Sequence, residues 1–548
     1  MDSFLRRLPV RSRFCGRASP ARTLTLLAVS SLVWPAMISA QGIRLSGRPM
    51  AGDVREFEIA TDGERVVYVA DQEQAGDIEL FSVPVLGGAP PTLHDFSELS
   101  AYWFLICEER VVFQNIGGAL FSMPIVGGEQ PRVLDSGYSD IVGFDGVLLW
   151  HGPIYSPRTG RVVYVRWRYE WDWLNWNVEE DLALYSVDVR RGELSLVRLD
   201  DLDASPFSPE PSVNDFVIVL DGGDVVFRTT SQGLYRTPID QESLVQFFIR
   251  AADPLLRSSD GARVVYLREN FSRDDELYSL PANGSTGEVL LSPNVSASAD
   301  FLVSEARNRV VYRDRFELFG VPIDGSSPPV KLNPMLDPFE RIESFQLSRE
   351  GKRVVYLADQ DADDQLELFG VPSDGSLAPV QLNDPLPPGG DVSAYSIGSQ
   401  RVVYLADQEQ DERFALYSAP IAPRKIGGGV IKVSGPLVPG GDVLSDFQLT
   451  PDGLRVVYRA DQDADEVIEL YVASLDGTSR PRKLNAPLVR GGDVQSGFRT
   501  GFQVTDDVVV YRADQDTDQV FELYASFLST PAERLRDLTG SAPGIRQR

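Results

Sequence analysis

The stretch Arg455-Val-Val-Tyr-Arg-Ala-Asp-Gln-Asp-Ala-Asp-Glu-Val-Ile-Glu-Leu-Tyr471 recurs along the whole chain and decides its fold. Successive copies begin 39 residues apart at the closest (Asp224 to Arg263) and 63 at the widest (Arg161 to Asp224). A strand-rich period of roughly 40–50 residues is typical of β-propeller blades. Including the type copy there are ten, with the others beginning at Arg65, Arg110, Arg161, Asp224, Arg263, Arg309, Arg353, Arg401 and Val508.

One repeat encodes four short strands, as residues 447–485 illustrate. Residues 447–450 alternate apolar and polar side chains, and 455–459 are rich in β-branched and aromatic ones, which favours strands. Pro451-Asp-Gly453 between them is a turn signal, since glycine tolerates positive φ. Residues 469–474 and 481–485 complete the set. The sequence therefore predicts an all-β protein of four-stranded blades.

The arrangement of the copies bears on how the blades close. Adjacent apolar residues in Val456-Val457-Tyr458 require cover on both faces of the sheet, which a radial stack of blades supplies and a β-sandwich does not. The five strictest copies are neighbours only if the last repeat meets the first, which favours one closed ring. The alternative is two smaller propellers, with the break between 110 and 260.

The two ends of the repeat region indicate how the ring closes. Ile43-Arg-Leu-Ser46 resembles the fourth strand at Lys483-Leu-Asn485 but has no strands before it. We expect it to complete the final blade. The alternative is that residues 534–538 supply that strand.

The repeat resembles that of the TolB-type propellers of the bacterial envelope. Asp452-Gly-x-Arg-Val-Val-Tyr-x-Ala-Asp461, Glu469-Leu-Tyr followed by Asp476-Gly477, and Lys483-Leu-Asn485 carry the resemblance over residues 41–548. It implies the propeller fold. It does not imply a particular activity, because a fold hosts many functions. TolB itself has an α/β domain before its propeller, and nothing here matches that domain.

Residues 1–40 predict a signal peptide with cleavage near Ala40, because a basic segment precedes an apolar run too short to span a bilayer. The alternative is a membrane anchor. No later segment predicts a membrane span, so we expect a periplasmic or secreted protein. A net charge of −28 excludes nucleic acid as a partner and favours cations or basic partners. After cleavage Cys107 is the remaining cysteine, and it reads as a buried thiol.

Carboxylates are concentrated in two loops of each strict repeat, the one after its second strand and the one between repeats. Both should emerge on the same face. Asp-x-Asp-x-Asp opens many calcium loops, because hard cations take several oxygens from one turn, although the complete EF-hand pattern is absent. The alternative is that the first Asp holds the turn and the others are solvated. The candidate Ca²⁺ ligands are Asp359, Asp361, Asp363, Asp461, Asp463, Asp465, Asp514, Asp516 and Asp518, with Asp391, Asp442 and Asp493 from the loops between repeats.

The third repeat replaces the acidic loop by an aromatic hairpin. Tryptophan and arginine dominate binding hot spots, so this hairpin could stack on a sugar or anchor a peptide. The alternative is that the rings pack on an adjacent blade. The candidate ligand-binding residues are Arg166, Trp167, Arg168, Trp171, Trp173 and Trp176.

Two functions are compatible with these patterns. The first is an exported, non-enzymatic propeller that serves as a binding platform for a protein or glycan and is stabilised by calcium. The second is a secreted hydrolase or lyase that acts on polysaccharide through acidic residues. His94 and His151 show no spacing typical of a metal site or a catalytic triad, and no catalytic carboxylate pair can be singled out.

Overall fold

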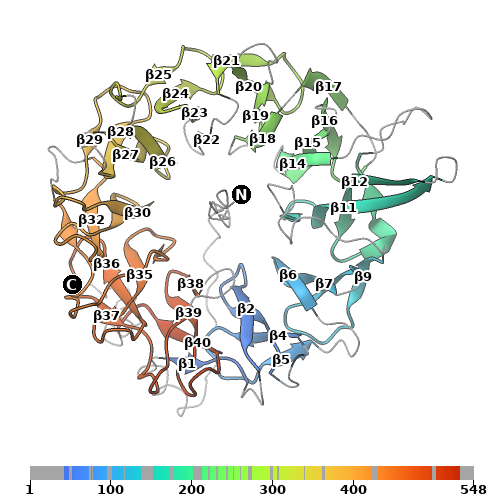
Figure 1. Ribbon diagram of the computed structural model, residues 1–548. Helices are drawn as coiled ribbons and strands as arrows, with labels where there is room; N and C mark the ends of the chain where they lie inside the picture. The colour runs from blue at the N-terminus through green and yellow to red at the C-terminus, as the bar shows by residue number, and fades with distance from the viewer. Residues whose placement is uncertain are drawn as a thin grey trace, which may run out of the picture. The chain divides into compact units, whose positions relative to one another are not determined.

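Ten four-stranded antiparallel sheets make up the compact unit Gln41–Thr530 in the computed structural model of the protein. They follow one another around a ring (Figure 1). The fold is therefore a ten-bladed β-propeller, and the alternative of two smaller propellers is wrong. The structure describes residues 42–47, 52–72, 76, 78–94, 101–115, 118–136, 152–172, 177–200, 213–219, 222–229, 233–241, 245–250, 252–258, 261–268, 274–296, 300–304, 308–337, 340–360, 365–422, 429–495 and 501–530.

The first five blades follow the chain, each with its strands in sequence order. Blade 1 is β2 (Val54–Ile59), β3 (Arg65–Ala70), β4 (Glu79–Pro84) and β5 (Thr92–His94); blade 2 is β6 (Ala101–Cys107), β7 (Arg110–Asn115), β8 (Leu120–Pro124) and β9 (Arg132–Asp135); blade 3 is β10 (Ile154–Ser156), β11 (Arg161–Asp172), β12 (Asn177–Asp188) and β13 (Val197–Arg198), with the 3-10 helix η1 (Gly192–Ser195); blade 4 is β14 (Val213–Val219), β15 (Asp224–Thr229), β16 (Gly233–Pro238) and β17 (Val245–Arg250); blade 5 is β18 (Ala252–Arg257), β19 (Arg263–Arg268), β20 (Asp275–Pro281) and β21 (Val289–Val295).

The second five blades follow the same order, except that the last one borrows its fourth strand from the start of the chain. Blade 6 is β22 (Asp300–Val303), β23 (Arg309–Asp314), β24 (Glu317–Pro322) and β25 (Val330–Lys331); blade 7 is β26 (Arg341–Leu347), β27 (Arg353–Asp359), β28 (Glu367–Pro372) and β29 (Val380–Gln381); blade 8 is β30 (Val392–Ile397), β31 (Arg401–Ala406), β32 (Ala415–Pro420) and β33 (Ile431–Lys432); blade 9 is β34 (Gln448–Leu449), β35 (Arg455–Ala460), β36 (Glu469–Ser474) and β37 (Arg482–Lys483); blade 10 is β38 (Phe502–Val504), β39 (Val508–Ala513), β40 (Glu522–Phe527) and β1 (Ile43–Arg44).

The second strand of each blade begins at the residue where a copy of the repeat begins. Both of its faces are buried. In β35, Val456 and Tyr458 pack against blade 8, whereas Val457 packs against blade 10. A β-strand directs alternate side chains to opposite faces, so consecutive apolar residues are needed where a sheet has a neighbour on each side.

Polar bonds between successive blades accompany this packing. In blade 8 the Arg401 Nε donates to Ser418 Oγ (2.7 Å), and Ser418 Oγ donates to the carbonyl of Leu475 in blade 9 (2.8 Å). The same arginine–serine–carbonyl contact joins blades 3 and 5 to the blades that follow them. In blade 7 Gly370 takes the serine's place, and a Cβ atom there would lie 3.0 Å from the Ile421 carbonyl oxygen.

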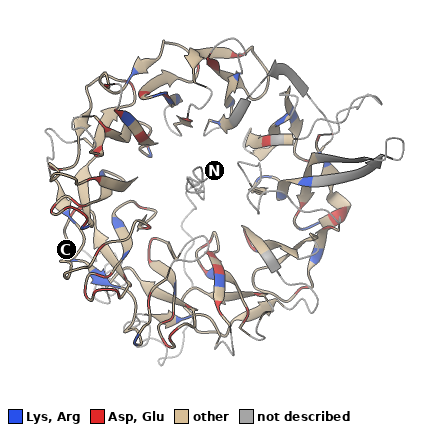
Figure 2. Ribbon diagram, in the orientation of Figure 1, with Lys and Arg blue, Asp and Glu red and all other residues tan. Residues whose placement is uncertain are grey.

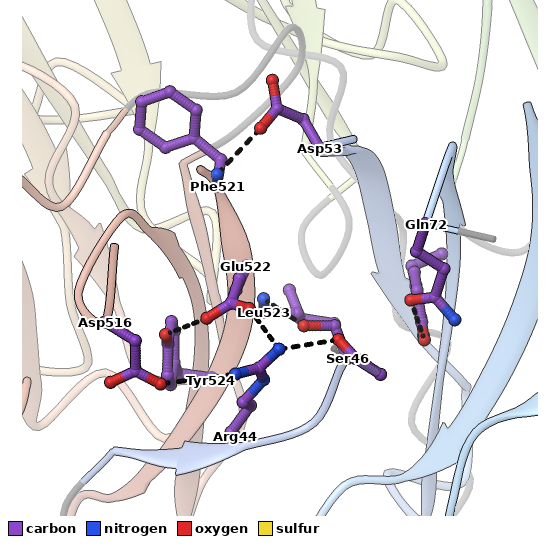
Figure 3. Close-up of polar contacts among 11 residues, drawn as sticks. Arg44, Ser46, Asp53, Gln72, Asp516, Phe521, Glu522, Leu523 and Tyr524 are labelled. Atoms are coloured by element: carbon purple, nitrogen blue, oxygen red, sulfur yellow. Dashed lines mark hydrogen bonds and ion pairs between the residues drawn. The ribbon is translucent and has the colours of Figure 1, made fainter. Parts of the chain in front are cut away.

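Blade 10 closes the ring with the N-terminal strand β1, as the sequence predicted (Figure 3). Ser46 Oγ accepts the Leu523 amide (3.1 Å), just as Asn485 Oδ1 accepts the Leu470 amide (2.9 Å) in blade 9. Arg44 forms ion pairs with Glu522 and Asp516 on β40 and in its preceding loop. The closing strand therefore reproduces in space the contacts that a continuous repeat makes along the chain.

Candidate functional site

The loop between the second and third strands meets the loop that enters the blade, on one face of the ring. In blade 9 the Asp442 amide donates to Asp461 Oδ1 (2.5 Å), and the Glu466 amide donates to Asp461 Oδ2 (3.2 Å). Asp442 Oδ1 in turn accepts the amide of Phe414 in blade 8 (2.7 Å). Asp442 and Asp461, from two different loops, are thus directly hydrogen-bonded. Asp461 is buried, and both of its oxygens accept backbone donors.

This pair of aspartates recurs as a clamp between blades. In each clamp the aspartate after the second strand, equivalent to Asp461, accepts the backbone amide of the aspartate in the loop that enters the blade, equivalent to Asp442. The carboxylate of this second aspartate accepts a backbone amide from the preceding blade. Charged acceptors make strong hydrogen bonds, and the clamp satisfies buried amides that would otherwise lack partners. The further clamps are Asp407 with Asp391 and Leu366, Asp514 with Asp493 and Ile468, and Asp71 with Asp53 and Phe521.

The pKa values of Asp71 and Asp493, each a member of a clamp, are shifted in opposite directions. Burial would raise the pKa of Asp71, but the hydrogen bonds from the Asp53 amide and from Arg55 hold it below the ordinary value. Burial raises the pKa of Asp493, and the negative charges of Asp514 and Asp518 raise it further. The hydrogen bond from the Ile468 amide lowers this pKa but does not cancel the rise. In these four loops the first aspartate is a structural acceptor of backbone amides, which agrees with the interpretation that this residue holds the turn.

The hairpin tips beyond the clamp are exposed and acidic (Figure 2). Asp463 forms an ion pair with Lys483 (2.9 Å). Asp465 lies against the entering loop, where a Cβ atom at Gly440 would be 2.7 Å from its carboxylate. The exposed carboxylates of three successive tips, in blades 8 to 10, are Glu409, Asp411, Glu412, Asp463, Asp465, Glu466, Asp516 and Asp518.

The candidate calcium ligands are thereby divided. Asp461 and Asp514 are buried acceptors, whereas Asp463, Asp465, Asp516 and Asp518 are exposed. Among the described residues, no three or more His, Cys, Asp or Glu side chains are grouped so that they could hold a metal ion. Asp359 ends β27, and Asp361 and Asp363 lie outside the described residues. Calcium binding by these tips stays a prediction.

The aromatic hairpin of blade 3 is present as two twelve-residue strands, β11 and β12, paired up to Asp172 and Asn177. Arg166 lies at the base of the hairpin. Its Nη1 donates to both carboxylate oxygens of Asp135 in blade 2 (2.8 Å each), and its guanidinium lies 4.4 Å from the ring centre of Tyr185. Arg166 thus joins two blades. The side chains of Trp167, Arg168 and Trp171, and all of Trp173 and Trp176, lie outside the described residues, so ligand binding there stays a prediction.

Two residues that sequence reasoning missed stand out in the structure. Asp135 accepts Tyr164 Oη (2.6 Å) as well as Arg166, and His94 is buried where blade 1 meets blade 2. The signal was present in the fourth strand of the repeat. Asp135 stands where other repeats have Asn485 and its equivalents, and His94 stands where they have Leu484.

Comparison with known proteins adds likeness of fold alone. No family model and no curated protein matches the chain. The chain is similar to a structure of the eukaryotic initiation factor (9% identity, TM-score 0.48, 82% of this chain and 97% of that one). It is also similar to an oligogalacturonate lyase in complex with manganese (11%, 0.33, 68% and 96%) and to the propeller domain of the Trilobed protease from Pyrococcus furiosus (10%, 0.31, 62% and 99%). Similarities this distant say nothing about activity. The ten four-stranded sheets by themselves place the protein in the β-propeller class.

In the described part of the chain, helices fall short of the length and apolarity that crossing a membrane requires.

Proposed function

We propose that the protein is an exported, non-catalytic binding platform whose acidic hairpin tips engage a cationic partner. The observation that carries this function is the contrast within a single loop. Asp461 is buried in the clamp, whereas Asp463, Asp465 and Glu466 remain exposed beyond it, and the same division recurs in blades 8 and 10. The ion pairs that these exposed carboxylates make, such as Asp463 with Lys483 and Asp516 with Arg44, lie within single blades, and the carboxylates repeat on one face.

The charge of the chain indicates the chemistry of the partner. A net charge of −28 repels anionic polymers at a distance and attracts basic ones, and such steering acts chiefly on the rate of association. A basic protein surface or a divalent cation fits the tips. The predicted signal peptide and the resemblance to TolB-type repeats support a place outside the cytoplasm.

The test compares two variants of equal net charge. Asp465→Asn/Asp518→Asn removes one negative charge from each of two tips, and Glu64→Gln/Glu129→Gln removes two exposed negative charges elsewhere. With an oligolysine peptide as probe, the tip variant should bind several-fold more weakly than the control in calorimetry at low salt. An equal loss in both variants would mean that net charge alone attracts the peptide, and the proposal would be wrong.

The competing function is hydrolysis or elimination on a polysaccharide. The tips would repel a polyanionic glycan such as polygalacturonate, so a neutral glycan is the better candidate substrate. Incubation with a panel of neutral and acidic glycans, followed by measurement of new reducing ends and unsaturated uronates, tests it directly. Turnover that survives repurification would replace the binding-platform proposal.

A further inference from the structure

Position 94 departs from the pattern of the repeat. In most blades one residue at the fourth strand donates its backbone amide to the carbonyl of a leucine in the third strand, as Leu484 does to Leu470. The side chain of this residue is apolar and buried. In blade 1 this position, opposite Leu80, holds His94, whose side chain is also buried. The equivalent residues are Leu45, Leu199, Leu332, Leu382, Val433 and Leu484.

His94 is built into the contact between blades 1 and 2. Its Nε2 lies 3.0 Å from Ser82 Oγ, and Ser82 Oγ donates to the carbonyl of Ile125 in blade 2 (2.5 Å). Arg65 Nη2 also donates to Ser82 Oγ (3.0 Å). The serine proton is directed to Ile125, so His94 must donate through Nε2. This leaves Nδ1 as the unprotonated nitrogen, and it is buried without a hydrogen-bond partner.

The surroundings oppose a second proton on the ring. Strand β3 contributes the guanidinium of Arg65, whose charge Asp62 partly offsets. Strand β4 contributes the Ser82 hydroxyl, β5 the Thr92 side chain, and blade 2 the Ile125 carbonyl and Gly127. Burial and then the charge of Arg65 lower the pKa of His94 to about 4, and they outweigh a hydrogen bond with the Ile125 carbonyl that favours the charged ring. A protonated Nδ1 would be a buried donor without an acceptor, beside an existing cation.

We propose that His94 makes the seam between blades 1 and 2 the acid-sensitive joint of the ring, which opens when the ring is acidified while the seam between blades 8 and 9 stays closed. The latter seam has the same arginine–serine–carbonyl contact but Val433 in place of the histidine. Blade 1 also receives the clamp from blade 10, so acid would loosen the propeller next to its point of closure.

The direction follows from linkage. A histidine whose pKa is lower in the closed seam than in the open one binds more protons when the seam is open, so closure weakens as the pH falls below the open-state value. With a pKa of about 4 closed and about 6.5 open, opening becomes roughly 25-fold more favourable between pH 7 and pH 5.

Hydrogen exchange resolved by peptide tests the proposal in the full-length protein, after correction for the intrinsic pH dependence of exchange. Peptides that cover β4, β5 and β8 should lose protection by about that factor from pH 7 to pH 5, and those covering β32, β33 and β36 should not. The variant His94→Leu restores the side chain of the other blades and should abolish the difference. Equal acid responses of wild type and His94→Leu would overturn the proposal.

A reciprocal variant moves the device to another seam. Val433→His places a histidine beside Arg401 and Ser418, and the acid response should then appear in β32, β33 and β36. Titration of the His94 ring by NMR provides the direct check. A His94 that titrates near its ordinary pKa while the seam keeps its protection would also refute the mechanism.

Discussion

Blades 9 and 10 hold their buried tyrosine with a neutral amide, whereas blades 3 and 5 hold it with a carboxylate. Tyr458 Oη lies 3.0 Å from Gln462 Oε1, and Tyr511 repeats the contact with Gln515 at 3.1 Å. Tyr164 instead donates to Asp135, and Tyr266 to Glu288, both at 2.6 Å. Blades 1, 7 and 8 follow the amide pattern, with glutamines at the equivalent place.

The carboxylate version recruits a cation that the amide version does not require. Arg166 pairs with Asp135 and lies over Tyr185, and Arg268 pairs with Glu288 and lies over Tyr278. Burial, and then the charge of Asp135, raise the pKa of Tyr164 well above its ordinary value, so it stays a donor. The repeat thus fixes the requirement for an acceptor beneath the tyrosine. The acceptor can be a neutral amide, or a carboxylate if an arginine nearby balances its charge.

Removal of the balancing cation should have the largest effect. Arg166→Met would leave Asp135 as a buried charge without the guanidinium that balances it, and we expect the free energy of unfolding to fall by about 3–5 kcal/mol. The double variant Asp135→Asn/Arg166→Met copies the neutral pattern of blade 9 and should recover most of the loss. Denaturant melts of the two variants measure this. A double variant as unstable as the single one would break the equivalence of the two patterns.

Loss of a clamp should cost somewhat less. Asp461→Ala removes the acceptor of the Asp442 and Glu466 amides. A buried donor left unpaired costs about 1–3 kcal/mol, and because Glu466 is exposed, water can replace the acceptor of its amide, so we expect a loss of about 2–3 kcal/mol. The matched control is Asp463→Ala in the same loop, whose exposed ion pair should change stability by less than about 0.5 kcal/mol. Similar melting temperatures for the two variants would remove the distinction between clamp and tip.

Conversion of a diverged blade toward the strict pattern should be stabilising. Asp200 stands at the place of Asn485, and its burial raises its pKa to about 6 despite Arg198. A carboxyl group whose pKa is higher in the folded chain weakens folding as pH rises from about 4 to about 6, by roughly 3 kcal/mol at most. Asp200→Asn should therefore raise the melting temperature at pH 7 and have little effect at pH 4. A gain of the same size at both pH values would point to packing rather than charge.

Calcium should have the smallest effect, and only on the strict blades. A site in the range of about 10⁻⁴–10⁻³ M, typical of extracellular modules, adds about 1.4 kcal/mol at ten times its dissociation constant. Melting curves in millimolar calcium, in magnesium at matched ionic strength and in EDTA test this. If calcium and magnesium shift the curve equally, the exposed tips are solvated turns and not calcium ligands.

Much of the fold could be predicted because each blade is written in one local segment. Alternation, turn residues and the Val-Val-Tyr core located the second strand of every blade, and Arg44, Leu45 and Ser46 matched the fourth strand that they complete. The candidate site was predicted less well. Asp461 and Asp463 belong to the same short motif, and residue type does not distinguish a buried acceptor from an exposed tip.

The sequence by itself determined the blade, its repetition and the residues that close the ring, because strand pairing within a repeat depends on neighbours in the chain. Only the tertiary structure decided which carboxylates accept hydrogen bonds between blades and which remain exposed. It also placed His94 against Ser82 and the blade 2 carbonyl, and Arg166 against Asp135. The bonds from Ser82 to Ile125 and from Arg166 to Asp135 join residues of different blades, and the local pattern that each residue obeys carries no information about its partner across the seam.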